Sequence, residues 1–200
     1  VTRSDTGVQQ ARQRVGSTGG RITVSASGSS LLEGELALAG GTAQQAGGSL
    51  QLTQTPGMQG GLDASGVLDA RHVLLSQASS QLSQGVSVQD RGTLLGAIAG
   101  QAVLNADQLN ASGLADLQIT TPGDLHLVGD VQLSVGRRLQ VEAQALRGDE
   151  GRQSQLRAAS VLLSGPEALG QYQGYSVTQR EAAQTGSAQL AVQASAGMAL

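Results

Sequence analysis

A short charged stretch between two strand-like segments carries a tripeptide with the residue types of a cell-attachment motif. Arg147-Gly148-Asp149 holds a guanidinium and a carboxylate apart by a flexible Gly, the pattern that integrins read. The surrounding run, residues 147–152, is rich in charge and Gly, so we expect it to be exposed. Arg147, Gly148 and Asp149 are therefore a candidate attachment site. Short motifs also arise by chance, and the alternative interpretation is a simple solvated corner.

The histidines and carboxylates are scattered along the chain. His72 and His126 are the only His residues, and His126 lies between Leu125 and Leu127, so strand alternation points it away from the core. A metal site or a catalytic base needs partners at defined spacing, and none accompanies these residues. Acidic residues at strand starts or corners are expected to bond their own backbone: Asp63, Asp69, Asp116, Asp124 and Asp130. We expect no metal, no cofactor and no enzyme activity.

Two further features are candidates for contact with a partner. Arg137 and Arg138 stand at the start of a predicted strand, where one of the two must face outward. A sugar or phosphate contact and an ordinary solvated corner are the two interpretations. Tyr172 and Tyr175, after Pro166, are the only aromatic residues of the chain, and aromatic side chains are enriched at binding hot spots. The alternative is that Tyr172 packs this segment against the rest of the fold.

An aliphatic repeat indicates how these residues are positioned. Sampling the chain every 22 residues from two starting points gives ten apolar residues, in a chain that is only 39% hydrophobic: Val73, Leu95, Leu117, Leu139, Val161, and Leu75, Ala97, Ile119, Val141, Leu163. A fixed period of this kind is typical of a solenoid that stacks equivalent strands. One period holds three short strands, with Gly at the corners. The sequence therefore predicts an all-β fold, a parallel β-helix with about 22 residues per coil.

The composition fits a narrow interior built from small aliphatic side chains. The chain has no Phe and no Trp, and 29 of its 200 residues are Gly. Cys is absent, which excludes disulfides and thiolate metal sites and suits a chain that crosses an oxidising space unfolded. A net charge of -3 gives no basic footprint for nucleic acid. No apolar run reaches the length that spans a membrane.

The pattern divides the chain into four parts. Residues 1–16 are expected to be an irregular leader or a preceding coil, and residues 17–164 the β-helix coils. Residues 165–186 interrupt the register as a loop or short-helix excursion, and residues 187–200 return to a β-helix that is cut off. The chain is expected to be an interior segment of a longer protein.

Recurring motifs resemble the filamentous haemagglutinin family, the very large two-partner secretion exoproteins of Gram-negative bacteria. The motifs are Gly-Gly-x-Ile-x-Val at 19–24, Gly-Asp-Leu-x-Leu at 123–127, Gly-Arg-x-Leu-x-Val at 136–141, Leu-Asp-Ala at 62–64 and 68–70, and Leu-Asn-Ala at 109–111. The likeness covers residues 16–164. It implies a right-handed β-helix, export through an outer-membrane transporter of the two-partner type, and a place outside the cell, secreted or associated with the outer membrane.

The resemblance implies a structural and adhesive segment of a large surface exoprotein, a virulence-type adhesin. Its partners would be the transporter during export and a host-cell or bacterial-surface receptor or glycan, with no nucleic acid. One alternative is the stalk of a contact-dependent inhibition toxin. Another is a carbohydrate-active β-helix enzyme, which requires carboxylates that converge on one face.

Overall fold

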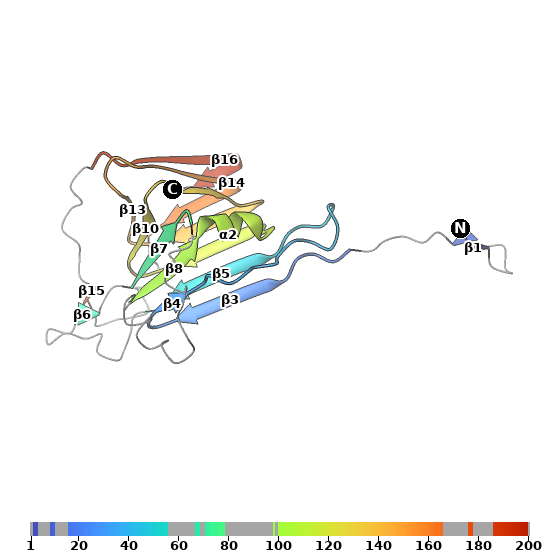
Figure 1. The fold of residues 1–200 in the computed structure, drawn as a ribbon, viewed down its shortest axis with the longest axis horizontal. Helices are drawn as coiled ribbons and strands as arrows, with labels where there is room; N and C mark the ends of the chain where they lie inside the picture. Colours follow the sequence, from blue (N-terminus) through green and yellow to red (C-terminus); the bar gives the residue numbers. More distant parts are fainter. Residues whose placement is uncertain are drawn as a thin grey trace.

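The computed structural model of the chain describes residues 16–55, 71–78, 98, 100–165 and 186–199 (Figure 1). Elsewhere it gives the backbone of four two-residue strands. Of these, β1 (Thr2–Arg3) pairs antiparallel with β2 (Gln9–Gln10), and β6 (Val67–Leu68) pairs parallel with β15 (Ser176–Val177). Within the described residues, no helix has both the length and the apolar character needed to cross a membrane.

The larger sheet of the described residues has seven strands, all paired in parallel. Its order is β11-β14-β12-β9-β5-β3, with β16 added on β14. The strands are β3 (Arg21–Ala26), β5 (Ser49–Gln54), β9 (Asp116–Thr120), β11 (Gln132–Ser134), β12 (Arg138–Glu142), β14 (Gln153–Ser164) and β16 (Gln189–Ala199). Strand β14 pairs first with β11 and then, after Ala158, with β12. The register of β16 on β14 shifts at the same place, so the sheet is curled there.

The smaller sheet has five described strands, also parallel, in the order β13-β10-β7-β8-β4. The strands are β4 (Ser30–Leu31), β7 (His72–Ser76), β8 (Gln101–Asn105), β10 (Asp124–Val128) and β13 (Ala145–Gly148). The two sheets enclose a single cluster of buried aliphatic side chains. Period-two alternation produces this core, because every second residue of each strand points inward.

Two aliphatic ladders cross the larger sheet in register. The first runs Ile22, Leu50, Leu117, Leu139, Val161 and Met198, and the second runs Val24, Leu52, Ile119, Val141 and Leu163. The central members are almost fully buried, with 0% exposure at Leu139 and 1% at Leu117. Burying a Leu side chain stabilises a fold by about 1.5–3 kcal/mol, so the ladders are a main source of cohesion between strands.

A short helix, α2 (Ala106–Ala111), connects β8 to β9. Its N-cap is Asn105, whose side-chain oxygen accepts a hydrogen bond from the Gln108 amide at 3.1 Å, as an N-cap requires. Ala106 and Leu109 face the core. Outside the core, the Asn110 side-chain amide forms two hydrogen bonds with the backbone of β11, as a neighbouring strand would. It donates to the Gln132 carbonyl and accepts from the Ser134 amide, both at 2.8 Å. The helix thereby covers the edge of β11.

The predicted fold class is wrong. The described chain forms two parallel sheets, one of them curled like half a barrel, together with a short helix, which is an α/β-like arrangement and not an all-β, right-handed parallel β-helix. Among the described strand pairs, the step of 22 residues holds from β9 to β12 and from β12 to β14, where Leu117, Leu139 and Val161 are direct neighbours. The other pairs use other steps.

Val73 illustrates the error. The fixed step placed it in the same ladder as Leu117, but Val73 lies in the smaller sheet, where it pairs with Leu125. The neighbour of Leu117 on that side is Leu50, from a much earlier segment. Leu95, expected between Val73 and Leu117, lies outside the described residues. An inward apolar residue fits beside any other inward apolar residue, so alternation alone does not say which strand lies next to which.

Candidate functional site

The candidate attachment tripeptide lies at the edge of the smaller sheet. Arg147 and Gly148 end β13, and Asp149 follows it. The carboxylate of Asp149 is held on both oxygens: Oδ1 lies 2.7 Å from Nε2 of His126, and Oδ2 accepts the Gly129 amide at 2.7 Å. Arg147 faces a carboxylate of its own, with Nη1 at 3.7 Å from Oδ2 of Asp124. Both charged groups of the tripeptide therefore have partners within the fold.

These contacts affect the ionisation of Asp149. The hydrogen bond from the Gly129 amide, followed by that from His126, holds the pKa of the carboxyl below its ordinary value of 3.8. Gly129 is suited to this position because its φ of 74° is one that side-chain-bearing residues rarely adopt. The corner is therefore built to receive a carboxylate from the neighbouring strand.

The two histidines lie on the same sheet and serve different contacts. His126 is half-buried between the buried Leu125 and Leu127, so its outward orientation is confirmed. On β7, Nδ1 of His72 accepts the backbone amide of Asp124 at 3.0 Å. Within the described ranges, no group of three or more His, Cys, Asp or Glu residues is placed to hold a metal ion.

The carboxylates Asp124 and Asp130 each engage a different arginine. Asp124, 1% exposed, faces Arg147. Asp130 is well exposed. Its Oδ2 lies 3.4 Å from Nη1 of Arg152, and its Oδ1 accepts a hydrogen bond from the Gln153 backbone amide at 2.8 Å. The amide belongs to β14 and not to the turn of Asp130 itself, so this contact differs from the local backbone hydrogen bond expected of a corner Asp.

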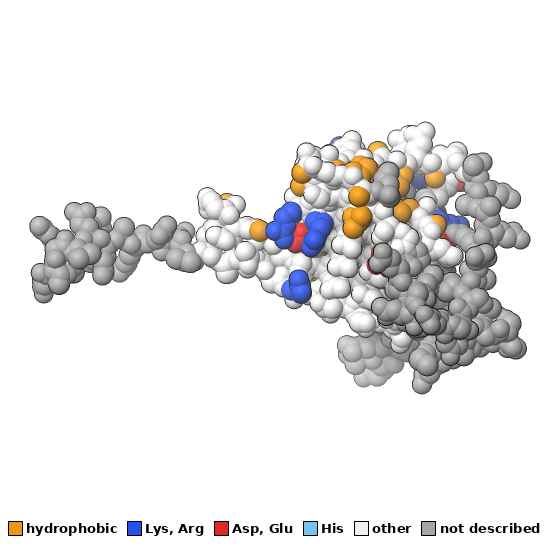
Figure 2. Space-filling view, turned by 180° about the vertical axis from the view of Figure 1, so that it is seen from behind, with side chains coloured by type: hydrophobic (Ala, Val, Ile, Leu, Met, Phe, Trp, Pro, Cys, Tyr) orange, Lys and Arg blue, Asp and Glu red, His pale blue; other side chains and the backbone are white. Residues whose placement is uncertain are grey.

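Arg137 and Arg138 gather around Asp116 at the start of β9 and β12. Nε of Arg137 donates to Oδ1 of Asp116 at 2.9 Å, its Nη2 bonds Oδ2, and Nε of Arg138 lies 3.9 Å from Oδ1. The Arg137 hydrogen bond is the main reason that the pKa of Asp116 lies below its ordinary value. Both arginine side chains remain more than half exposed. Figure 2 shows basic side chains gathered beside an acidic one, with hydrophobic side chains grouped elsewhere on the same face.

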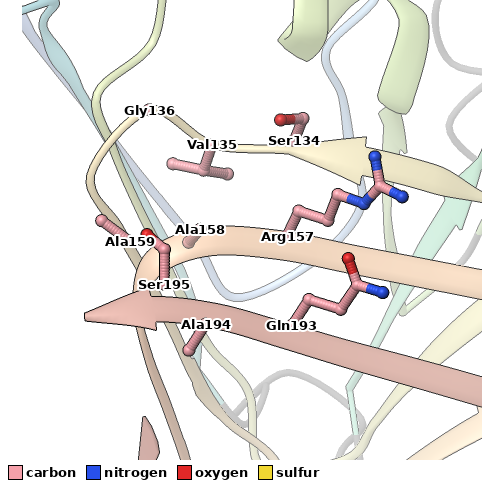
Figure 3. Close-up of a pocket in the computed structure, with 9 residues that line it drawn as sticks. All are labelled: Ser134, Val135, Gly136, Arg157, Ala158, Ala159, Gln193, Ala194 and Ser195. Carbon is pink, nitrogen blue, oxygen red and sulfur yellow. The ribbon is translucent and has the colours of Figure 1, made fainter. Parts of the chain in front are cut away.

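A hollow of about 470 Å³ lies where the larger sheet curls. Three neighbouring strands supply polar side chains in register, Ser134 from β11, Arg157 from β14 and Gln193 from β16. Figure 3 shows the Arg157 and Gln193 side chains extending in the same direction along neighbouring strands, with Ser134 on the next strand beyond Arg157. Ser195 borders the hollow as well.

Sequence reasoning missed this hollow. Alternation does mark Arg157 as outward-facing, because it lies between Leu156 and Ala158, which are buried. The sequence signal for the pairing of Arg157 with Gln193 is absent, because the 22-residue register is lost between them. The other predicted contact residues, Tyr172 and Tyr175, lie outside the described part of the chain.

Comparison of the chain with protein-family models, with curated proteins and with solved structures gives no match.

Proposed function

We propose that this chain is a structural and adhesive segment of a large secreted surface exoprotein. The observation that carries the proposal is a polar ladder on the outward face of the larger sheet. Gln51, Gln118 and Gln140 are direct neighbours on β5, β9 and β12, and Thr53 lies two residues beyond Gln51; all four side chains are half-buried. Amide groups thus recur at the strand spacing of about 4.8 Å, above a core of aliphatic ladders.

A surface of this kind suits attachment by many weak contacts. Each amide or hydroxyl offers both a donor and an acceptor to a ligand. A single exposed contact of this type is weak, but repetition raises the effective concentration of the next contact and gives avidity. The stacked aliphatic ladders beneath, with Leu139 at their centre, keep the outward groups in register.

The place of action is part of the same proposal. The motifs at 19–24, 123–127 and 136–141 and the absence of Cys support a two-partner secretion exoprotein, displayed at the bacterial surface after passage through an outer-membrane transporter. In the producing strain, antibody raised against the chain should label intact cells while that transporter is present and fail to label them once its gene is deleted. Unchanged labelling would overturn the export route.

Adhesion is tested with beads that carry the purified chain. Coated beads should bind cultured epithelial cells in greater number than beads carrying no protein. Gln118→Glu, which places a charge in the middle of the ladder, should lower the number bound. Gln44→Glu makes the same change at an exposed residue of a turn and should leave binding unaltered. Equal binding by coated and bare beads would overturn the adhesive function.

The same assay separates the ladder from the Arg147-Gly148-Asp149 tripeptide. Because His126 and Gly129 hold the Asp149 carboxylate, we expect Asp149→Glu to leave bead binding unchanged. A loss of binding as large as that of Gln118→Glu would instead assign attachment to the tripeptide.

A further inference from the structure

The hollow at the bend of the larger sheet is lined by one cationic side chain of the described residues, that of Arg157. Arg157 is exposed and makes no ion pair within the described residues, whereas Arg147 and Arg152 each face an aspartate. Its backbone is fixed, because the Arg157 carbonyl accepts the Val135 amide at 2.8 Å and β14 is paired on both sides. The guanidinium is thus presented to the hollow from a rigid strand.

The neighbours of Arg157 define which anion fits. One guanidinium binds one carboxylate through two parallel hydrogen bonds. Ser134 and Gln193, in register on either side, add a hydroxyl and an amide that donate to and accept from hydroxyl groups. Gly136 and Ala159 border the space with little side-chain volume. A single cation with flanking hydroxyl and amide groups suits a ring that carries one carboxylate and several hydroxyls.

A second, smaller hollow of about 220 Å³ continues the first along the same strands. It is lined by Gln132, Gln155 and Ala191, each two residues before Ser134, Arg157 and Gln193 in its strand, and by Gln153 and Gln189. Two residues of a strand span about 6.6 Å. The polar groups therefore continue past the guanidinium, as an elongated ligand requires.

We propose that these two hollows bind a carboxylated saccharide, with its carboxylate on Arg157 and its hydroxyls on Ser134, Gln193 and the glutamines beyond. The inference deepens the proposed adhesive function and rests on it for its biological meaning. The shared chemistry is a carboxylate on a sugar ring, whether the sugar is a uronic acid or a sialic acid.

The test is calorimetric titration of the whole chain with two pairs of probes. The first pair is a hexamer of galacturonic acid and its methyl ester; the second is the methyl glycoside of sialic acid and its methyl ester. Binding of one or both acids, with loss on esterification, supports the proposal and identifies the source of the carboxylate. No binding of either acid, or equal binding of acid and ester, overturns it.

Matched variants locate the site. Arg157→Gln should weaken binding of the acid by about tenfold or more, the loss expected when a hydrogen bond to a charged group is removed. Arg138→Gln makes the same charge change at an exposed guanidinium on another strand, outside the lining of both hollows, and should change affinity by less than about twofold. Equal losses in the two variants would overturn the assignment to the hollow. If beads adhere to cells while no acidic sugar binds, this inference fails and the adhesive function stands.

Discussion

Nε2 of His126 and Oδ1 of Asp149 lie 2.7 Å apart, and this contact ties the end of β13 to β10. The second oxygen of Asp149 accepts the Gly129 amide in the turn that follows β10. One carboxylate thus joins two neighbouring strands and the corner between β10 and β11. Both oxygens of Asp149 therefore bond groups within the fold, and its role is structural.

Stability in acid should depend on Asp149. Its pKa in the fold lies below the ordinary value of 3.8, so the ionised carboxylate stabilises the fold above its unfolded pKa, and this stabilisation is lost as pH falls through the folded pKa. We expect Asp149→Asn to lower the urea midpoint at about pH 7, with a cost below about 1 kcal/mol because solvent screens a group this exposed. The difference from the parent chain should shrink towards about pH 2, because the Asp149 carboxyl takes up a proton as the pH falls through its folded pKa and then, like the Asn amide, carries no charge.

The control is Glu150→Gln, which removes the neighbouring exposed carboxylate. It should leave the midpoint unchanged at both pH values. If Glu150→Gln lowers the midpoint as Asp149→Asn does, the loss of one negative charge, and not the loss of the His126 and Gly129 contacts, explains the lower stability.

Of the two Gly-Gly pairs before β3 and β5, Gly19, Gly47 and Gly48 leave no room for a Cβ atom beside neighbouring backbone, and Gly20 does. A Cβ atom on Gly47 would collide with the carbonyl oxygen of Gly113, a backbone atom that has no free space to move into. We therefore expect Gly47→Ala to destabilise the chain by about 1–3 kcal/mol or more, as overpacking does. Gly20→Ala is the matched control, because a Cβ there meets nothing within 4 Å. Thermal unfolding compares the two, and equal transition temperatures would contradict the packing of Gly47 on Gly113.

The inward faces of the strands were predictable, and their neighbours were predictable only in part. The 22-residue period identified Leu117, Leu139 and Val161 as one ladder, because β9, β12 and β14 follow one another at that constant step. The same rule failed for Val73, which pairs with Leu125. Helix α2 was also missed, although Asn105 and Asp107 carry an N-terminal signal, since each 22-residue period was interpreted as three short strands joined by corners.

The candidate sites divide in the same way. Arg147, Asp149, Arg137 and Arg138 were recognisable because each carries its chemistry within one short segment. The hollow around Arg157 was not, because its polar residues come from three strands and depend on the pairing of β14 with β16. Sequence spacing predicts such a site only where the register between segments is known.

Leu139 should be a strong test of the shared ladder. It is 0% exposed and lies directly between Leu117 and Val161, so Leu139→Ala leaves a cavity and should cost about 2–5 kcal/mol. Leu162→Ala removes the same atoms from an outward position that is 37% exposed, and should cost less than about 1 kcal/mol. Urea unfolding of both variants measures the difference, and similar losses would contradict the inward and outward faces of this sheet.

The cluster of Asp116, Arg137 and Arg138 predicts that salt raises the stability of an Asp116 variant relative to the parent chain. In the parent chain the Asp116 carboxylate lies between the guanidinium groups of Arg137 and Arg138, and its lowered pKa means that this attraction is present above about pH 4 and lost as the carboxyl is protonated in acid. Asp116→Asn removes the attraction and leaves two neighbouring positive charges. We expect a loss of about 1 kcal/mol at neutral pH, a modest value because both guanidinium groups are solvated.

Raising the salt concentration from about 0.01 to about 1 M shortens the screening length from about 30 to about 3 Å, so the stability of Asp116→Asn should rise relative to the parent chain. Urea midpoints at the two salt concentrations measure this. The double variant Asp116→Asn/Arg137→Gln, which also removes one of the repelling charges, should lose most of the relative gain, and an undiminished gain in the double variant would show that the Arg137–Arg138 repulsion is not its source.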